Sequence, residues 1–133
     1  MNQLSGKMRV VIVTGTSVGA GATVTSLRPE AGQVWIVLWA TGEQNDGAVS
    51  SGWYFTDPET PAGANLFNIA ALPANTPVAF GALAASAAPA GWGQGFKLNY
   101  SRYASFVFTA SAAAKVCTIK ALVLEYTNTE DDF

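Results

Sequence analysis

The sequence contains no histidine, and charged residues make up only 12% of its 133 positions, about half the share in an average soluble domain. Without histidine the chain lacks the commonest general base, the usual partner of a nucleophilic serine or cysteine, and the commonest transition-metal ligand. The strands expected below carry almost no acidic side chains that could form a catalytic carboxylate pair. We therefore expect a protein that is not an enzyme and that uses no cofactor and no metal ion.

Basic residues are scarce too. The seven lysines and arginines are scattered and the formal net charge is −2, so no basic stripe is available for phosphates and we expect no nucleic-acid partner. No apolar run approaches the ~20 residues needed to cross a bilayer. The apolar stretch after Lys7 is broken by Thr14 and Gly15, too early for a secretory signal. These features predict a soluble protein that is made in a cytoplasm and has no membrane partner.

Cysteine occurs once, so an intrachain disulfide is impossible. Cys117 lies inside the apolar run 116–124, and nothing nearby in the sequence would stabilise a thiolate. We interpret it as a small buried hydrophobic residue rather than as a nucleophile.

Strand signals are abundant by contrast, and no helical period of useful length interrupts them. A loop rich in Ala, Ser, Pro and Gly is expected at 84–95, and an acidic tail at 128–133 follows an ordered core of about 8–127. Residues 1–133 are therefore predicted to form one all-β domain, an antiparallel β-sandwich. An eight-stranded jelly roll fits best, and an immunoglobulin-like sandwich is the alternative. The expected strands are 8–14, 22–27, 33–41, 51–56, 65–72, 78–83, 96–101, 105–109 and 115–126.

Two of these strands, 33–41 and 115–126, are apolar on both faces. Only one face of a strand in an antiparallel sandwich points into the core. The second face must be covered by loops of the same chain or by a neighbouring subunit, since large exposed apolar patches usually mark interaction surfaces. We assign the following residues to the second faces, as candidate contacts in a homo-oligomer: Trp35, Val37, Trp39, Val116, Leu122 and Leu124.

Aromatic residues offer an alternative function. Trp92 lies in the expected 84–95 loop, and a tryptophan held in a loop usually has a partner surface. Exposed Trp and Tyr side chains also stack on sugars, so Trp92 with Trp53 or Tyr54 would suit a carbohydrate- or receptor-binding module whose partner is a surface glycan.

Two further patterns are interpreted as turns rather than as ligand sites. Residues 14–21 match the glycine-rich turn of short-chain dehydrogenases, but a Thr- and Val-rich segment follows where a helix would be required. We predict a hairpin turn there. Asp46, Asp57 and Glu59 have no recognisable calcium-loop spacing and are interpreted as solvated turn residues.

The segment Pro29-Glu30-Ala31-Gly32-Gln33-Val34-Trp35 and the closing Lys120-Ala121-Leu122-Val123-Leu124-Glu125-Tyr126 resemble small jelly-roll virion proteins of bacterial viruses. The resemblance covers roughly residues 23–128 and is one of pattern. It implies a capsid-decoration, head-fibre or minor-capsid role on the virion, and production in the host cytoplasm. It also implies self-association, commonly as trimers, and contact with a major capsid protein. It brings no catalytic residues.

Overall fold

The structure is a computed structural model that describes residues 6–79 and 96–127, and every regular element in this part of the chain is a strand. The prediction of an all-β chain is confirmed, and the described residues contain no helix that could span a membrane. The expected 84–95 loop and 128–133 tail lie outside the described residues. The strands are β1 (Lys7–Thr16), β2 (Gly21–Leu27), β3 (Gln33–Gln44), β4 (Val49–Asp57), β5 (Thr60–Leu72), β6 (Val78–Ala79), β7 (Phe96–Leu98), β8 (Tyr103–Ala110) and β9 (Val116–Thr127).

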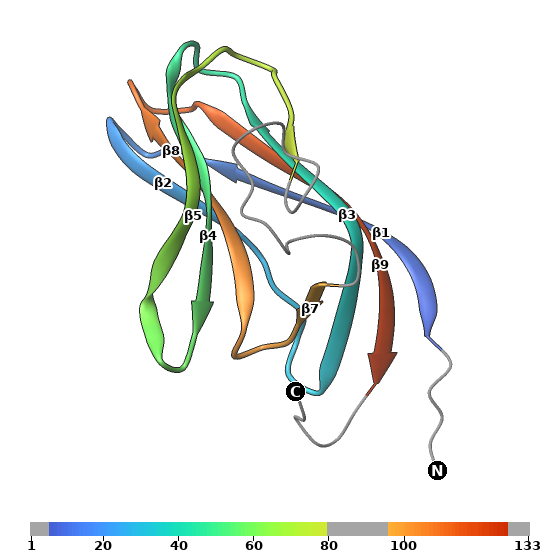
Figure 1. Cartoon of the computed structure of the whole chain (residues 1–133). Helices are drawn as coiled ribbons and strands as arrows, with labels where there is room; N and C mark the ends of the chain where they lie inside the picture. The colour runs from blue at the N-terminus through green and yellow to red at the C-terminus, as the bar shows by residue number, and fades with distance from the viewer. Residues whose placement is uncertain (1–5, 80–95, 128–133) are drawn as a thin grey trace.

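The strands form two antiparallel sheets packed as a β-sandwich, as predicted (Figure 1). One sheet has the order β1-β9-β3-β6, with β7 also paired to β3, and the other has the order β2-β8-β4-β5. Nine strands are described, which matches the nine segments expected as strands, whereas the jelly roll that was favoured has eight. Because β9 occupies one edge of β3, β6 and β7 share its other edge, β6 near Thr41 and β7 near Trp35. The nine strands therefore fill eight positions across the two sheets.

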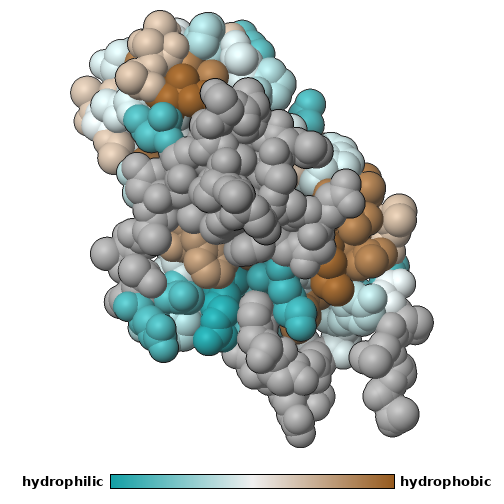
Figure 2. All heavy atoms as spheres, viewed as in Figure 1, coloured by the Kyte–Doolittle hydropathy of each residue, from teal (hydrophilic) through white to brown (hydrophobic). Residues whose placement is uncertain are grey.

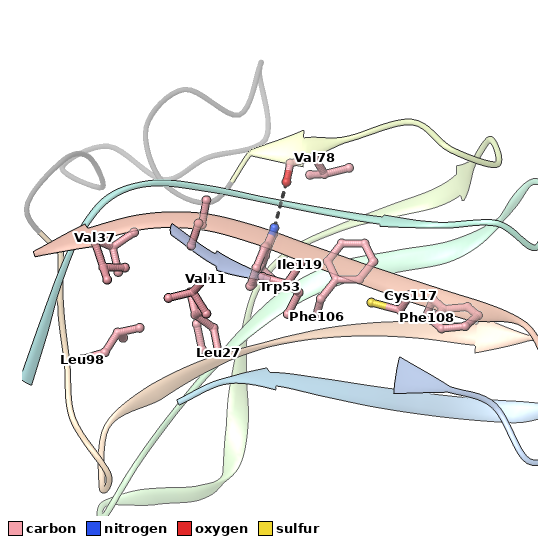
Figure 3. Close-up of a cluster of buried hydrophobic side chains, with 14 of the residues drawn as sticks. Val11, Leu27, Val37, Trp53, Val78, Leu98, Phe106, Phe108, Cys117 and Ile119 are labelled. Carbon is pink, nitrogen blue, oxygen red and sulfur yellow. Dashed lines mark hydrogen bonds between the residues drawn. The ribbon is translucent and has the colours of Figure 1, made fainter. Parts of the chain in front are cut away.

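The core lies between the sheets and is built from alternate residues of the central strands. Trp53 of β4 is fully buried, packs edge-on against Phe106 with ring centroids 5.4 Å apart, and donates its indole N–H to the Val78 carbonyl at 3.1 Å (Figure 3). Cys117 is buried in the same cluster, and burial raises the pKa of its thiol to about 11. The interpretation of Cys117 as a buried hydrophobic residue is confirmed.

The glycine-rich segment after β1 connects the two sheets. β1 pairs with β9, whereas β2 pairs with β8, so residues 17–20 cross from one sheet to the other. The prediction of a hairpin turn here is wrong, because each strand finds its partner near the far end of the chain. A strand follows Gly21, as expected from its Thr- and Val-rich sequence.

Asp46, in the turn between β3 and β4, ties that turn to the start of the β8–β9 turn. Its carboxylate accepts the Ser111 N–H at 2.6 Å and the Ser111 hydroxyl at 2.7 Å, and Lys115 Nζ lies 3.8 Å away. The hydrogen bonds from Ser111 hold the pKa of Asp46 below its usual value, and the charge of Lys115 adds to this effect. The interpretation of Asp46 as a turn residue is confirmed, but its carboxylate is bonded to the β8–β9 turn rather than free in solvent.

Candidate interaction surface

A β-bulge in β3 decides which of its side chains face outward. Val37 lies opposite Val123 of β9, and Trp39 lies opposite the preceding residue, Leu122. Leu38 is therefore an extra residue, and the alternation of the strand reverses at this point. Trp35 and Val37 are 5% and 2% exposed, whereas Trp39 is 43% exposed.

The assignment of Trp35 and Val37 to an outer face is consequently wrong. Both belong to the core cluster. Trp35 also contacts a side chain of β9, because its indole N–H donates to Glu125 Oε2 at 2.8 Å. Arg9 of β1 donates to the same oxygen at 2.6 Å, and its guanidinium lies 5.8 Å from the Trp35 ring centroid. Arg9, Trp35 and Glu125 therefore link the inner faces of β1, β3 and β9 at one end of the sheet.

Two opposing effects set the charge of Glu125. Burial alone would raise its pKa, but the hydrogen bonds from Trp35 and Arg9, with the positive charges of Arg9 and Lys7, outweigh it and hold the pKa below the usual value. Glu125 is therefore a carboxylate at neutral pH, and it accepts two hydrogen bonds that a protonated acid would lose in part.

Acid is expected to destabilise the fold through Asp46 and Glu125. Both have a folded-state pKa below the ordinary values of 3.8 and 4.5 that serve for the unfolded chain. Their stabilisation is therefore complete above about pH 5 and is lost as the pH falls through the folded-state values. Urea unfolding of the wild type should show a lower midpoint at pH 3 than at pH 6. The variant Asp46→Asn/Glu125→Gln should show a smaller difference, and equal wild-type midpoints at both pH values would contradict the assignment.

Side chains that point away from the core on β1, β9 and β3 form a continuous surface, which we call the outer apolar face. The strand register places them in two rows across the sheet, Met8–Leu124–Ile36 and Val10–Leu122–Trp39. On the edge strand β1, Met8, Val10 and Ile12 are 61%, 63% and 62% exposed. Hydrophobic surface is visible where these strands run in Figure 2. The outer apolar face consists of Met8, Val10, Ile12, Ile36, Trp39, Leu122 and Leu124.

The size of this face limits what it can do alone. Met8 to Ile12 span about 14 Å along the strand, and three strands with their side-chain margins give roughly 300 Å². Two copies packed face to face would bury roughly 600 Å², against the ~1,200–2,000 Å² of stable, specific interfaces. The outer apolar face alone would thus give a weak contact. A stable assembly would need several such contacts or a second interface beside this one.

The sequence identified part of this face. Leu122 and Leu124 lie on the outer side of β9, where they are half-buried between β1 and β3, while Cys117 and Val123 of the same strand point into the core. Val116 is also on the outer side but pairs with Thr16 at the far end of the sheet, beyond the two apolar rows. The exposed residues Met8, Val10 and Ile12 were missed, although both faces of 10–13 are apolar, which is the same signal that singled out 33–41.

The aromatic residues proposed for ligand contact are not brought together. Trp53 is fully buried between the sheets, so its assignment to a ligand surface is wrong. The adjacent Tyr54 is half-buried. Trp92 lies outside the described residues. Within the described part of the chain, no cluster of three or more Cys, Asp or Glu side chains could hold a metal ion.

Comparisons with known proteins add no relative. No protein-family model matches the sequence, and no curated protein matches it. The resemblance to jelly-roll virion proteins therefore stays a prediction, and the function rests on the geometry described above.

Proposed function

We propose that this chain is a structural subunit of a virion, a jelly-roll protein of the capsid-decoration or minor-capsid kind. It self-associates on the capsid surface and contacts the major capsid protein. The observation that carries this proposal is the outer apolar face, where three β1 side chains are more exposed than buried beside the apolar rows of β9 and β3. A contiguous apolar patch of roughly 300 Å² is comparable to the largest patch on many soluble monomers, and such patches often mark interaction sites.

The strand order supports the jelly-roll part of the proposal. β1 neighbours β9 in one sheet, and β2 neighbours β8 in the other, so strands from the two ends of the chain are paired in nested fashion. A long antiparallel ribbon rolled into two sheets gives this arrangement. The weak contact estimated for one outer apolar face also suits a lattice, because many small contacts add up when subunits are held side by side.

The self-association is tested by light scattering coupled to size-exclusion chromatography between about 1 and 500 μM. The mass should rise above that of a monomer with increasing concentration, and Val10→Lys should abolish the rise, since it places a charge between Met8 and Ile12 on the edge strand of the outer apolar face. Val24→Lys is the matched control, because Val24 is 59% exposed on β2 of the other sheet. A wild type that stays monomeric throughout would contradict the proposal.

The virion role needs a separate measurement. Antibodies against the purified chain should label intact virus particles from a producing culture, and electron microscopy would place the label on the capsid surface. Particles that are purified to homogeneity and contain none of this chain would contradict the role.

A further inference from the structure

The edge of β1 that faces away from β9 is unpaired among the described strands. Residues along a strand direct their N–H and C=O groups alternately to the two sides. Ser17, directly after β1, bonds toward the β9 side, with its N–H donating to the Lys115 carbonyl and its carbonyl accepting from Ala114, both at 2.8 Å. The β1–β9 register runs without a shift from Lys7 to Thr16. The even-numbered residues, Met8 to Thr16, therefore present their backbone groups to the open edge.

This edge has few of the features that usually protect edge strands, because its two charged residues, Lys7 and Arg9, lie at its start and alternate with the outward-facing apolar residues. Such strands are commonly short, bulged, or interrupted by proline or charge. Of the other edge strands, β6 and β7 are two and three residues long, β5 contains Pro61, and β2 has seven residues. β1 has ten residues, no bulge and no proline. Its outward side chains, Met8, Val10, Ile12, Thr14 and Thr16, include no charge. Both the backbone groups and the side chains of β1 are thus ready to pair with another strand.

We propose that β1 pairs antiparallel with β1 of a second copy about a two-fold axis, with Val10 opposite Val10 of the second copy. This inference rests on the proposed self-association and names the contact that would make it. The pairing joins the two outer apolar faces into one sheet surface, and each copy uses the same residues, as a two-fold interface requires.

The register follows from matching the apolar side chains. With Val10 on the axis, Met8 lies opposite Ile12 of the second copy, and the three β1 side chains of the outer apolar face pair entirely with apolar residues. Lys7 then lies opposite Val13 and Arg9 opposite Val11, so no two like charges are directly opposed. The residues Met8, Val10 and Ile12 would form on the order of six backbone hydrogen bonds across the axis.

A second copy fits this edge because in the two-fold register each outward apolar side chain of β1, at Met8, Val10 and Ile12, meets an apolar partner. The outer apolar face alone gives too small a contact, as estimated above, whereas strand pairing adds the backbone edge and places both apolar faces side by side. A third layer, or a capsid surface, could then cover a face of roughly 600 Å².

Disulfide trapping tests the register. Two Val10 Cα atoms in a hydrogen-bonded antiparallel pair lie about 5.5 Å apart, within the range that a disulfide spans. Val10→Cys should therefore form a covalent dimer in high yield with oxidised glutathione, which takes up the two electrons. Thr14→Cys is the matched control on the same strand: in this register the two Thr14 residues lie about 27 Å apart and should not cross-link. The native Cys117 is fully buried and contributes no background.

Each outcome decides the proposal. A dimer of Val10→Cys with at least tenfold less dimer of Thr14→Cys supports the pairing and its register. Equal cross-linking of both variants, or of neither while light scattering shows an oligomer, overturns the β1 pairing but leaves self-association standing. A wild type that is monomeric at all concentrations, with no cross-link, overturns both and means that the β1 edge is open or meets a different polypeptide.

Discussion

Replacing Trp53 by alanine is expected to lower the free energy of unfolding by about 3–5 kcal/mol, the largest effect of any single substitution considered. Trp53 is fully buried at the centre of the sandwich, and its removal leaves a cavity beside Phe106. The Val78 carbonyl would also lose the indole N–H that it accepts. Since domains of this size are usually stable by only about 5–15 kcal/mol, urea denaturation should show a large drop in the midpoint.

Two variants separate the causes of this loss. Trp53→Phe keeps an aromatic ring but removes the hydrogen bond to Val78, and should cost less than Trp53→Ala, with about 1–3 kcal/mol from the carbonyl left without its partner. Trp39→Ala, on the outer apolar face, removes an indole that is 43% exposed and should cost less than about 1 kcal/mol in dilute protein. If Trp39→Ala lowered the free energy of unfolding as much as Trp53→Ala, the assignment of Trp53 to the core and Trp39 to the outer apolar face would be contradicted.

Replacing Gly42 by alanine is expected to cost about 1–3 kcal/mol. Gly42 lies in β3 after the bulge at Leu38. A Cβ atom added to it would point into the core and come within 2.5 Å of the Phe106 ring. Phe106 is itself fully buried and packed edge-on against Trp53, so its ring cannot move away from the added methyl group. The clash must therefore be relieved by shifting one sheet against the other.

Two control variants are compared with Gly42→Ala by the same measurement of the free energy of unfolding. Gly19→Ala should be near neutral, because no heavy atom lies within 4 Å of a Cβ at that position. In a Phe106→Leu background, the cost of Gly42→Ala should fall, since the smaller side chain leaves space for the added methyl group. Additive costs in the double variant would show that the two positions do not contact each other.

The sequence predicted the sandwich because β-strand patterns are local. Alternation in 105–109 and 115–126 reports directly on β8 and β9, and each inner residue of β9 from Cys117 to Val123 is buried as the alternation indicates. Turn residues marked most strand ends to within a few positions. Three ends differ more: β3 continues to Gln44, β5 begins at Thr60 rather than at residue 65, and β7 ends at Leu98 rather than at residue 101.

The candidate site was only partly predictable because it depends on two non-local features. The bulge at Leu38 arises from pairing between β3 and β9 and leaves no trace in the apolar run 33–41, so Trp35 and Val37 were placed on the wrong side. The identity of the edge strand depends on sheet order, which periodicity does not contain. Val10 could therefore be recognised as a strand residue from the sequence, but not as part of an open edge.

Amide hydrogen exchange along β1 tests most directly whether a second copy covers this edge. In dilute protein the amides of Val11 and Val13, bonded to β9, should exchange slowly, while those of Val10 and Ile12 should exchange at least a hundredfold faster. At concentrations where the mass indicates oligomers, the amides of Val10 and Ile12 should become protected as well. Fast exchange at Val10 and Ile12 in the oligomer would contradict the account, because the edge would then remain open to water while the copies associate elsewhere.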